Sequence, residues 1–169
     1  MYKRAMIYFT TSHGQSWISR VIKWVLGSKF SHVAIGFLEG KDQIIYEADL
    51  NKGTVRRSYK EFLADNSIIY KFSLDINSLN FRKMRTSADR MVGRKYDLKS
   101  AIGSGWDRLF GRKEDGRKEL ERLFCSELVT FLLEDIYGED FTPEDPENVD
   151  PRDLYEIICK DSRFVKRHK

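Results

Sequence analysis

The sequence has few of the residues that would place it among disulfide-rich, zinc-bound or membrane-spanning proteins. It contains two cysteines and three prolines in 169 residues. Cys125 and Cys159 form no CxxC pair, and no cysteine–histidine cluster has zinc-finger spacing. No apolar run approaches the roughly 20 residues of a membrane span, and residues 1–14 lack the apolar stretch of a signal peptide. We therefore expect a soluble, cytoplasmic protein without a cofactor.

The length and composition indicate one packed domain, residues 1–169. A domain usually contains about 100–200 residues. Apolar residues make up 41% of the chain and aromatic residues 13%, which is typical of a protein with a core and not of a disordered segment. A chain of this length buries roughly two thirds of its unfolded surface, so it needs no metal or disulfide to fold.

The net charge of +4 is modest, but it is unevenly distributed. Residues 81–122 are basic on balance, residues 127–156 are acidic, and the tail at 163–169 is basic again. Runs of one charge are usually solvated faces, so we expect no nucleic-acid partner for the basic segment 82–122. A weak contact between the basic tail and an anionic membrane surface is an alternative that the pattern leaves open.

Hydrophobic periodicity predicts strands early in the chain and helices later. Alternating apolar residues indicate strands, and apolar residues spaced by three and four indicate helices. The predicted strands cover residues 5–10, 31–38, 43–49, 54–56 and 67–72; the predicted helices cover residues 16–26, 78–92, 98–110, 125–137 and a segment opened by Asp150 and Pro151. This order is typical of an α+β fold, with a small antiparallel sheet or partly open barrel and helices packed on one side.

Cys125 is the first candidate for chemistry, because it stands where the clearest helix is predicted to begin. An apolar stripe follows it at helical spacing: Leu128, Val129, Leu132, Leu133 and Ile136. The unpaired N–H groups at a helix N-terminus stabilise a thiolate. A cysteine nucleophile also needs a histidine that takes its proton and a polar group that orients the histidine.

His32 and Glu47 are the candidates for these two roles. Strand alternation places His32 on one face with Ala34 and Gly36, which are small enough to leave room for an approaching helix end. Glu47 lies on the next strand of a predicted antiparallel hairpin, within reach of the far imidazole nitrogen. Each residue alone is more typical of a structural position, so the group of three is a hypothesis at this point.

Two further residues of the same types are assigned structural roles. His13 lies between the first strand and the next helix and is interpreted as a loop or cap residue. Cys159 follows two isoleucines in the last helix and is predicted to lie in the core.

Five short stretches occur in the order of the motifs of one enzyme family. Residues 29–37 (KFSHVAIGF) contain His32, and residues 124–129 (FCSELV) contain Cys125. The others are residues 45–48 (IYEA), 93–97 (GRKYD) and 150–154 (DPRDL). Together they resemble the motifs of the permuted NlpC-type papain-like cysteine amidases and peptidases, the YiiX-like group. The resemblance covers most of the chain, from about residue 17 to residue 154.

The resemblance implies a circularly permuted papain-like fold in which the histidine precedes the cysteine. It implies a hydrolase that acts on a peptide or other amide through an acyl-enzyme. By motif position, Cys125 carries over as the nucleophile, His32 as its base and Glu47 as the orienting residue. Tyr96 carries over as a site-lining residue and as an oxyanion donor through its hydroxyl. No metal is implied.

Two other functions fit the same residues. Enzymes similar to lecithin:retinol acyltransferase share the permuted order and act on lipid esters, which an apolar cleft near Trp17 and Trp24 would suit. A non-enzymatic binding module on the same fold is the second alternative. In such a module, the Cys125 thiol would titrate near the ordinary pKa of about 8.5.

Overall fold

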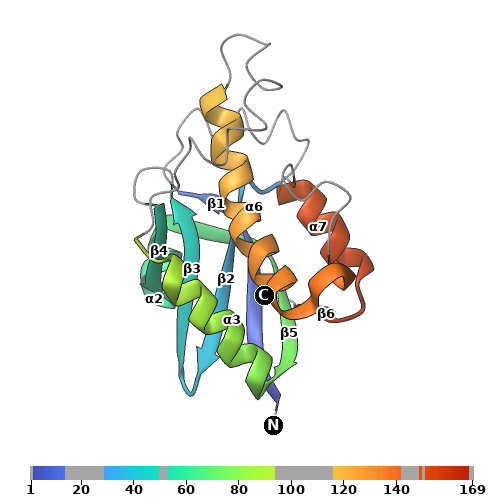
Figure 1. The fold of residues 1–169 in the computed structure, drawn as a ribbon. Coiled ribbons are helices and arrows are strands. Elements are labelled where there is room, and N and C mark those ends of the chain that lie inside the picture. The colour runs from blue at the N-terminus through green and yellow to red at the C-terminus, as the bar shows by residue number, and fades with distance from the viewer. Residues whose placement is uncertain are drawn as a thin grey trace.

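The protein contains one open six-stranded sheet. The computed structural model describes residues 2–13, 29–49, 53–93, 116–141, 149 and 151–167. Within these residues the strands are antiparallel and lie in the order β4-β3-β2-β1-β5-β6 (Figure 1). They are β1 (Tyr2–Ser12), β2 (His32–Glu39), β3 (Asp42–Asp49), β4 (Gly53–Ser58), β5 (Asn66–Asn77) and β6 (Phe164–Arg167). The predicted α+β class is confirmed, and of the two predicted forms the structure has the antiparallel sheet.

Helices lie on both faces of this sheet. The described ones are α2 (Tyr59–Asp65), α3 (Ser78–Met91), α6 (Gly116–Tyr137) and α7 (Pro151–Lys160), with a 3-10 turn η1 (Gly138–Phe141). α3, α6 and α7 cover one face, and α2 packs on the other (Figure 1). The prediction that the helices share one side is therefore wrong for α2. None of these described helices is long and apolar enough to cross a membrane. The predicted helices at 16–26 and 98–110 lie outside the described residues.

Strand alternation divides the core between the two faces. Three residues of β2, Val33, Ile35 and Phe37, belong to the larger cluster of buried residues, which lies under α3, α6 and α7. Ala34, between them, belongs to a smaller cluster with Phe62 of α2. β2 and β3 pair as the predicted antiparallel hairpin. The predicted assignment of these residues to opposite faces is confirmed.

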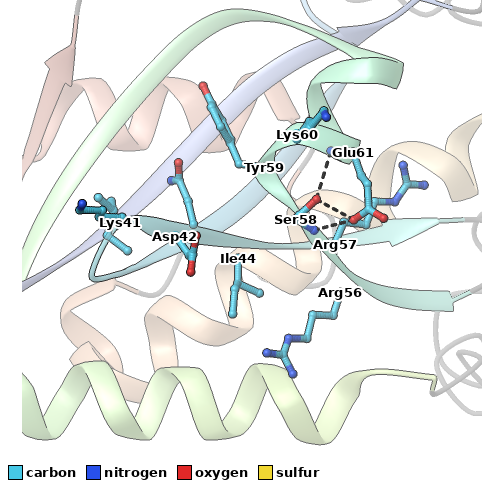
Figure 2. A pocket seen from close by; sticks show the side chains of 11 residues that line it. Lys41, Asp42, Ile44, Arg56, Arg57, Ser58, Tyr59, Lys60 and Glu61 are labelled. Atoms are coloured by element: carbon cyan, nitrogen blue, oxygen red, sulfur yellow. Dashed lines mark hydrogen bonds between the residues drawn. The ribbon is translucent and has the colours of Figure 1, made fainter.

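α2 is a helix that the sequence prediction omitted. It begins with a capping box, in which the Glu61 N–H donates to Ser58 Oγ at 3.2 Å and the Ser58 N–H donates to Glu61 Oε2 at 2.8 Å (Figure 2). The box satisfies two backbone donors that a helix start leaves unpaired. Phe62 then anchors the helix in the smaller cluster. The predicted strand ended at Arg56, whereas β4 ends at Ser58. The prediction therefore did not identify Ser58 as the residue that caps a following helix.

Part of the C-terminal basic segment forms a strand, β6. β6 pairs with β5 at the edge of the sheet. Its basic side chains are engaged there: the Lys166 ammonium lies 4.2 Å from the centre of the Tyr70 ring, and Arg167 Nε donates to Ser73 Oγ at 2.7 Å. The sheet thus holds these charges in place.

We expect Gly36→Ala to destabilise the β2–β3 hairpin. A Cβ at this position would lie 2.7 Å from Cδ1 of Ile45 and 3.0 Å from Cε2 of Tyr8, which is closer than unbonded carbons approach. Overpacking of this kind costs about 1–3 kcal/mol, and thermal unfolding would show it as a lower midpoint. Gly40→Asn is the control, because position 40 has open space and Asn tolerates its positive φ. An unchanged midpoint for Gly36→Ala would contradict the expectation.

Candidate active site

His32 and Glu47 meet on adjacent strands. His32 is the first residue of β2, and Glu47 lies in β3. His32 Nε2 is 2.8 Å from Glu47 Oε2. Because an ionised carboxylate only accepts hydrogen bonds, Nε2 carries the proton and donates it. The two side chains are 18% and 5% exposed, so little water competes for this bond. Nδ1 is left as the ring nitrogen for a second partner.

Cys125 is that second partner, and it comes from a distant part of the sequence. It lies on α6, which packs against β2 and β3, and its side chain is fully buried. Burial lowers the pKa of the His32 imidazole. The charge of Cys125 and the hydrogen bond with it, followed by the hydrogen bond and the charge of Glu47, outweigh burial and raise this pKa from 6.5 to about 10. The imidazole therefore stays protonated at neutral pH.

The predicted start of the cysteine helix is wrong. α6 begins at Gly116, so Cys125 lies well inside the helix and not at its tip. The favourable field of a helix N-terminus fades within the first turn, and it does not act on Cys125. Inside a helix, each backbone N–H bonds the carbonyl four residues earlier, so the Cys125 N–H is not free for an oxyanion. Five of residues 116–122 are charged and Leu120 is the one large apolar residue among them, so no apolar periodicity indicated the earlier start.

Cys125 belongs to the core-facing stripe of α6, and this explains its burial. Spacings of three and four connect it to residues that are all buried: Leu128, Val129, Leu132 and Leu133. The helix approaches the face of β2 that carries Val33 and Ile35. The predicted approach across Ala34 and Gly36 is wrong, because Tyr8, Ile45 and Phe62 fill that side of the sheet.

The second histidine has a structural position. His13 Nδ1 donates to the Ala64 carbonyl at 3.0 Å, and its Nε2 accepts from Ser67 Oγ at 2.7 Å. These bonds join the end of β1 to the end of α2 and the start of β5. This placement agrees with its interpretation as a cap residue. Tyr96, Trp17 and Trp24 lie outside the described residues.

The second cysteine lies on the surface. Cys159 is exposed, so its predicted core position is wrong. The buried face of α7 carries Leu154 and Ile158, which are spaced by four. Cys159 is one residue further on and is turned away from that face, because each helical residue advances by about a quarter of a turn.

Arg57 of β4 also contacts this site, and the sequence analysis missed it. Its Nε lies 2.9 Å from Glu47 Oε1. Arg57 pairs with Ile45 across the β3–β4 ladder, so it is the diagonal neighbour of Glu47 on the same face. Strand alternation could have placed Arg57 on the face that carries Glu47, but the predicted strand ended one residue too early, at Arg56.

A cavity of about 820 Å³ lies elsewhere, at the edge formed by β3, β4 and α2 (Figure 2). Its basic side chains are Lys41, Arg56, Arg57 and Lys60, and its acidic side chains are Asp42 and Glu61. His32, Glu47 and Cys125 do not line it. The cavity is therefore distinct from the candidate active site, but it adjoins the site at Arg57, which lines the cavity and contacts Glu47.

The fold is similar to that of a solved structure, the metalloprotein YiiX from Escherichia coli O157:H7. The alignment has a TM-score of 0.62 and covers 99% of this chain and 96% of that chain, at 15% sequence identity. The resemblance to the YiiX-like group is thus confirmed at the level of the fold. No protein-family model matches the sequence, and no curated protein matches it.

A metal centre does not fit the residues that the structure describes. YiiX is described as a metalloprotein. In the described part of this chain, no group of three or more His, Cys, Asp or Glu side chains is placed to hold a metal ion. Protein zinc sites usually supply three or four such ligands. His32 has one carboxylate and one thiol around it.

Proposed function

We propose that the protein is a cysteine hydrolase of the circularly permuted papain-like type, which cleaves an amide through an acyl-enzyme. Cys125 is the nucleophile, His32 its acid and base, and Glu47 the residue that orients His32. The observation that supports this is the position of one imidazole between a buried carboxylate and a buried thiol. A histidine whose pKa is shifted by specific partners is a common mark of a functional site.

The bonds that form and break in the proposed reaction involve only Cys125, His32, the substrate and water. The Cys125 thiolate attacks the acyl carbon, a C–S bond forms, and the bond to the leaving amine breaks as His32 gives that amine its proton. Neutral His32 then takes a proton from water, whose oxygen attacks the thioester. The carboxylic acid leaves, and the thiolate and imidazolium are restored.

The oxyanion of this reaction needs a donor other than the Cys125 backbone. The Cys125 N–H lies inside α6 and is committed to the helix. The Tyr96 hydroxyl, which the family resemblance implies, is our proposed donor. The sulfur is also fully buried, so local opening must precede contact with substrate. We therefore expect slow acylation of Cys125 compared with an exposed thiol.

Acylation of Cys125 is the result that tests this function. The exposed thiol is first removed by Cys159→Ser. The protein is then incubated with an activated peptide ester and, separately, with a fatty acyl ester, and its peptides are analysed by mass spectrometry. We expect the acyl mass on the Cys125 peptide, with more from the peptide ester. A predominant fatty acyl adduct would favour the lipid-ester alternative. No adduct from either donor would contradict the proposal.

A further inference from the structure

The Glu47 carboxylate is held from two sides. Oε2 accepts the hydrogen bond from His32, and Oε1 lies 2.9 Å from Arg57 Nε. The other end of the same guanidinium donates from Nη1 to Asp65 Oδ2 at 2.6 Å. Arg57 thus lies between the last residue of α2 and the carboxylate that contacts the imidazole.

Burial strengthens the electrostatic interaction between Arg57 and Glu47. The Glu47 side chain is 5% exposed and that of Arg57 is 18% exposed, so water screens their charges poorly. In the part of the chain that the structure describes, Glu47 Oε1 has no aligned hydrogen bond, and the nearby guanidinium is its compensating charge. A buried carboxylate that loses its counter-charge is strongly disfavoured. It would turn toward water, and this change weakens its bond to His32.

We propose that Arg57 is a positioning residue of this site, which holds the Glu47 carboxylate in the orientation that His32 requires. Arg57 acts on the imidazole only through Glu47. This inference rests on the proposed function for its catalytic meaning, but the contact that it describes can be measured without any turnover.

Arg56 provides a matched control on the same strand. It has the same side chain and lies next to Arg57, but it is 46% exposed and its ion pair is with Asp89 at 3.9 Å. Alternation along β4 directs the two arginines to opposite faces. Arg57→Gln and Arg56→Gln therefore remove the same charge from neighbouring positions, and only the first removes the partner of Glu47.

The direct readout is the His32 imidazole N–H in a ¹H–¹⁵N spectrum of the histidine side chains. The sequence has three histidines, which simplifies assignment. We expect a downfield, slowly exchanging Nε2–H signal in the parent protein and in Arg56→Gln, and its loss in Arg57→Gln. Arg57→Lys keeps a charge but cannot reach both carboxylates with one fork, so we expect a weakened signal.

The second readout is the rate at which iodoacetamide alkylates Cys125 at neutral pH, in the Cys159→Ser background. We expect Arg57→Gln to lower this rate relative to Arg56→Gln, because a displaced Glu47 carboxylate no longer holds the imidazole that contacts the sulfur. Asp65→Asn removes the support of Arg57 from α2 and leaves its contact with Glu47. We expect this variant to keep most of the signal and of the rate.

The outcomes separate this inference from the proposed function. Equal signals and rates for Arg57→Gln and Arg56→Gln would overturn the role of Arg57. Equal losses in Arg57→Gln and Asp65→Asn, with equal losses of stability, would also overturn it and leave Arg57 as a structural residue. A third outcome is loss of the His32 signal in Arg57→Gln, in a protein that hydrolyses no acyl donor. It would support the role of Arg57 in positioning Glu47 and reject the proposed hydrolase function.

Discussion

Cys125→Ala is expected to abolish turnover of any acyl donor that the protein hydrolyses, with a loss in kcat/KM of at least about 10³-fold. The variant removes the atom that forms the covalent bond, so no acyl-enzyme can form. Losses of this size or larger are usual when the nucleophile of a catalytic triad is removed. The measurement is steady-state hydrolysis of the donor that acylates Cys125 best.

Two further variants make this result specific. Cys125→Ser replaces only the sulfur atom, by the smaller oxygen, in a buried cluster. Retained stability with lost turnover would show that chemistry and not packing was removed. Cys159→Ser removes the exposed cysteine and should leave turnover unchanged. If Cys125→Ala kept native turnover while Cys159→Ser lost it, our assignment of Cys125 as the nucleophile would be wrong.

His32 is expected to make the stability of the protein depend on pH between neutral and alkaline conditions. Its pKa is about 10 in the folded protein, against about 6.5 for a free imidazole. The proton is therefore bound more tightly in the folded state. This contribution is fully present below about pH 6.5 and is lost as the pH rises through about 10. The advantage of wild type over His32→Gln in unfolding free energy should therefore be larger at about pH 6.5 than at about pH 10.

Urea unfolding of both proteins across this range measures the difference. The comparison with His32→Gln cancels the titration of most other groups. His13→Gln is the control, because His13 bonds a backbone carbonyl and a serine hydroxyl and has no acidic partner in the described residues. A wild-type advantage that stays constant from neutral to alkaline pH would show that the folded protein does not hold the His32 proton.

The hairpin at the centre of the site was predictable because strand alternation is a local property. The spacing of His32 and Glu47 on β2 and β3 follows from a period of two and a short turn. The resulting contact at 2.8 Å needed no information from distant residues. The apolar stripe of α6 was equally clear, because its buried residues recur at three and four.

The parts that were missed depend on tertiary contacts or on polar segments. The first turns of α6 are charged, and no apolar period marked them. α2 is short and contributes one buried residue, Phe62, so its capping box was the main signal. The position of Arg57 follows from the end of β4, and strand ends are poorly determined by sequence. The meeting of Cys125 with His32 was predicted as a hypothesis from residue types and from the family resemblance, because no local pattern connects segments so far apart.

The location of Cys125 on the stripe of α6 that packs in the core affects how the protein tolerates mutation. The helix face that carries the sulfur also carries Leu128 and Leu132, which are fully buried. A smaller side chain at either position would leave a cavity and let the helix shift. The sulfur would then move with it. Under the proposed function, a substitution on this face of the helix changes packing and reactivity together. We therefore expect substitutions there to accumulate more slowly than folding alone would require.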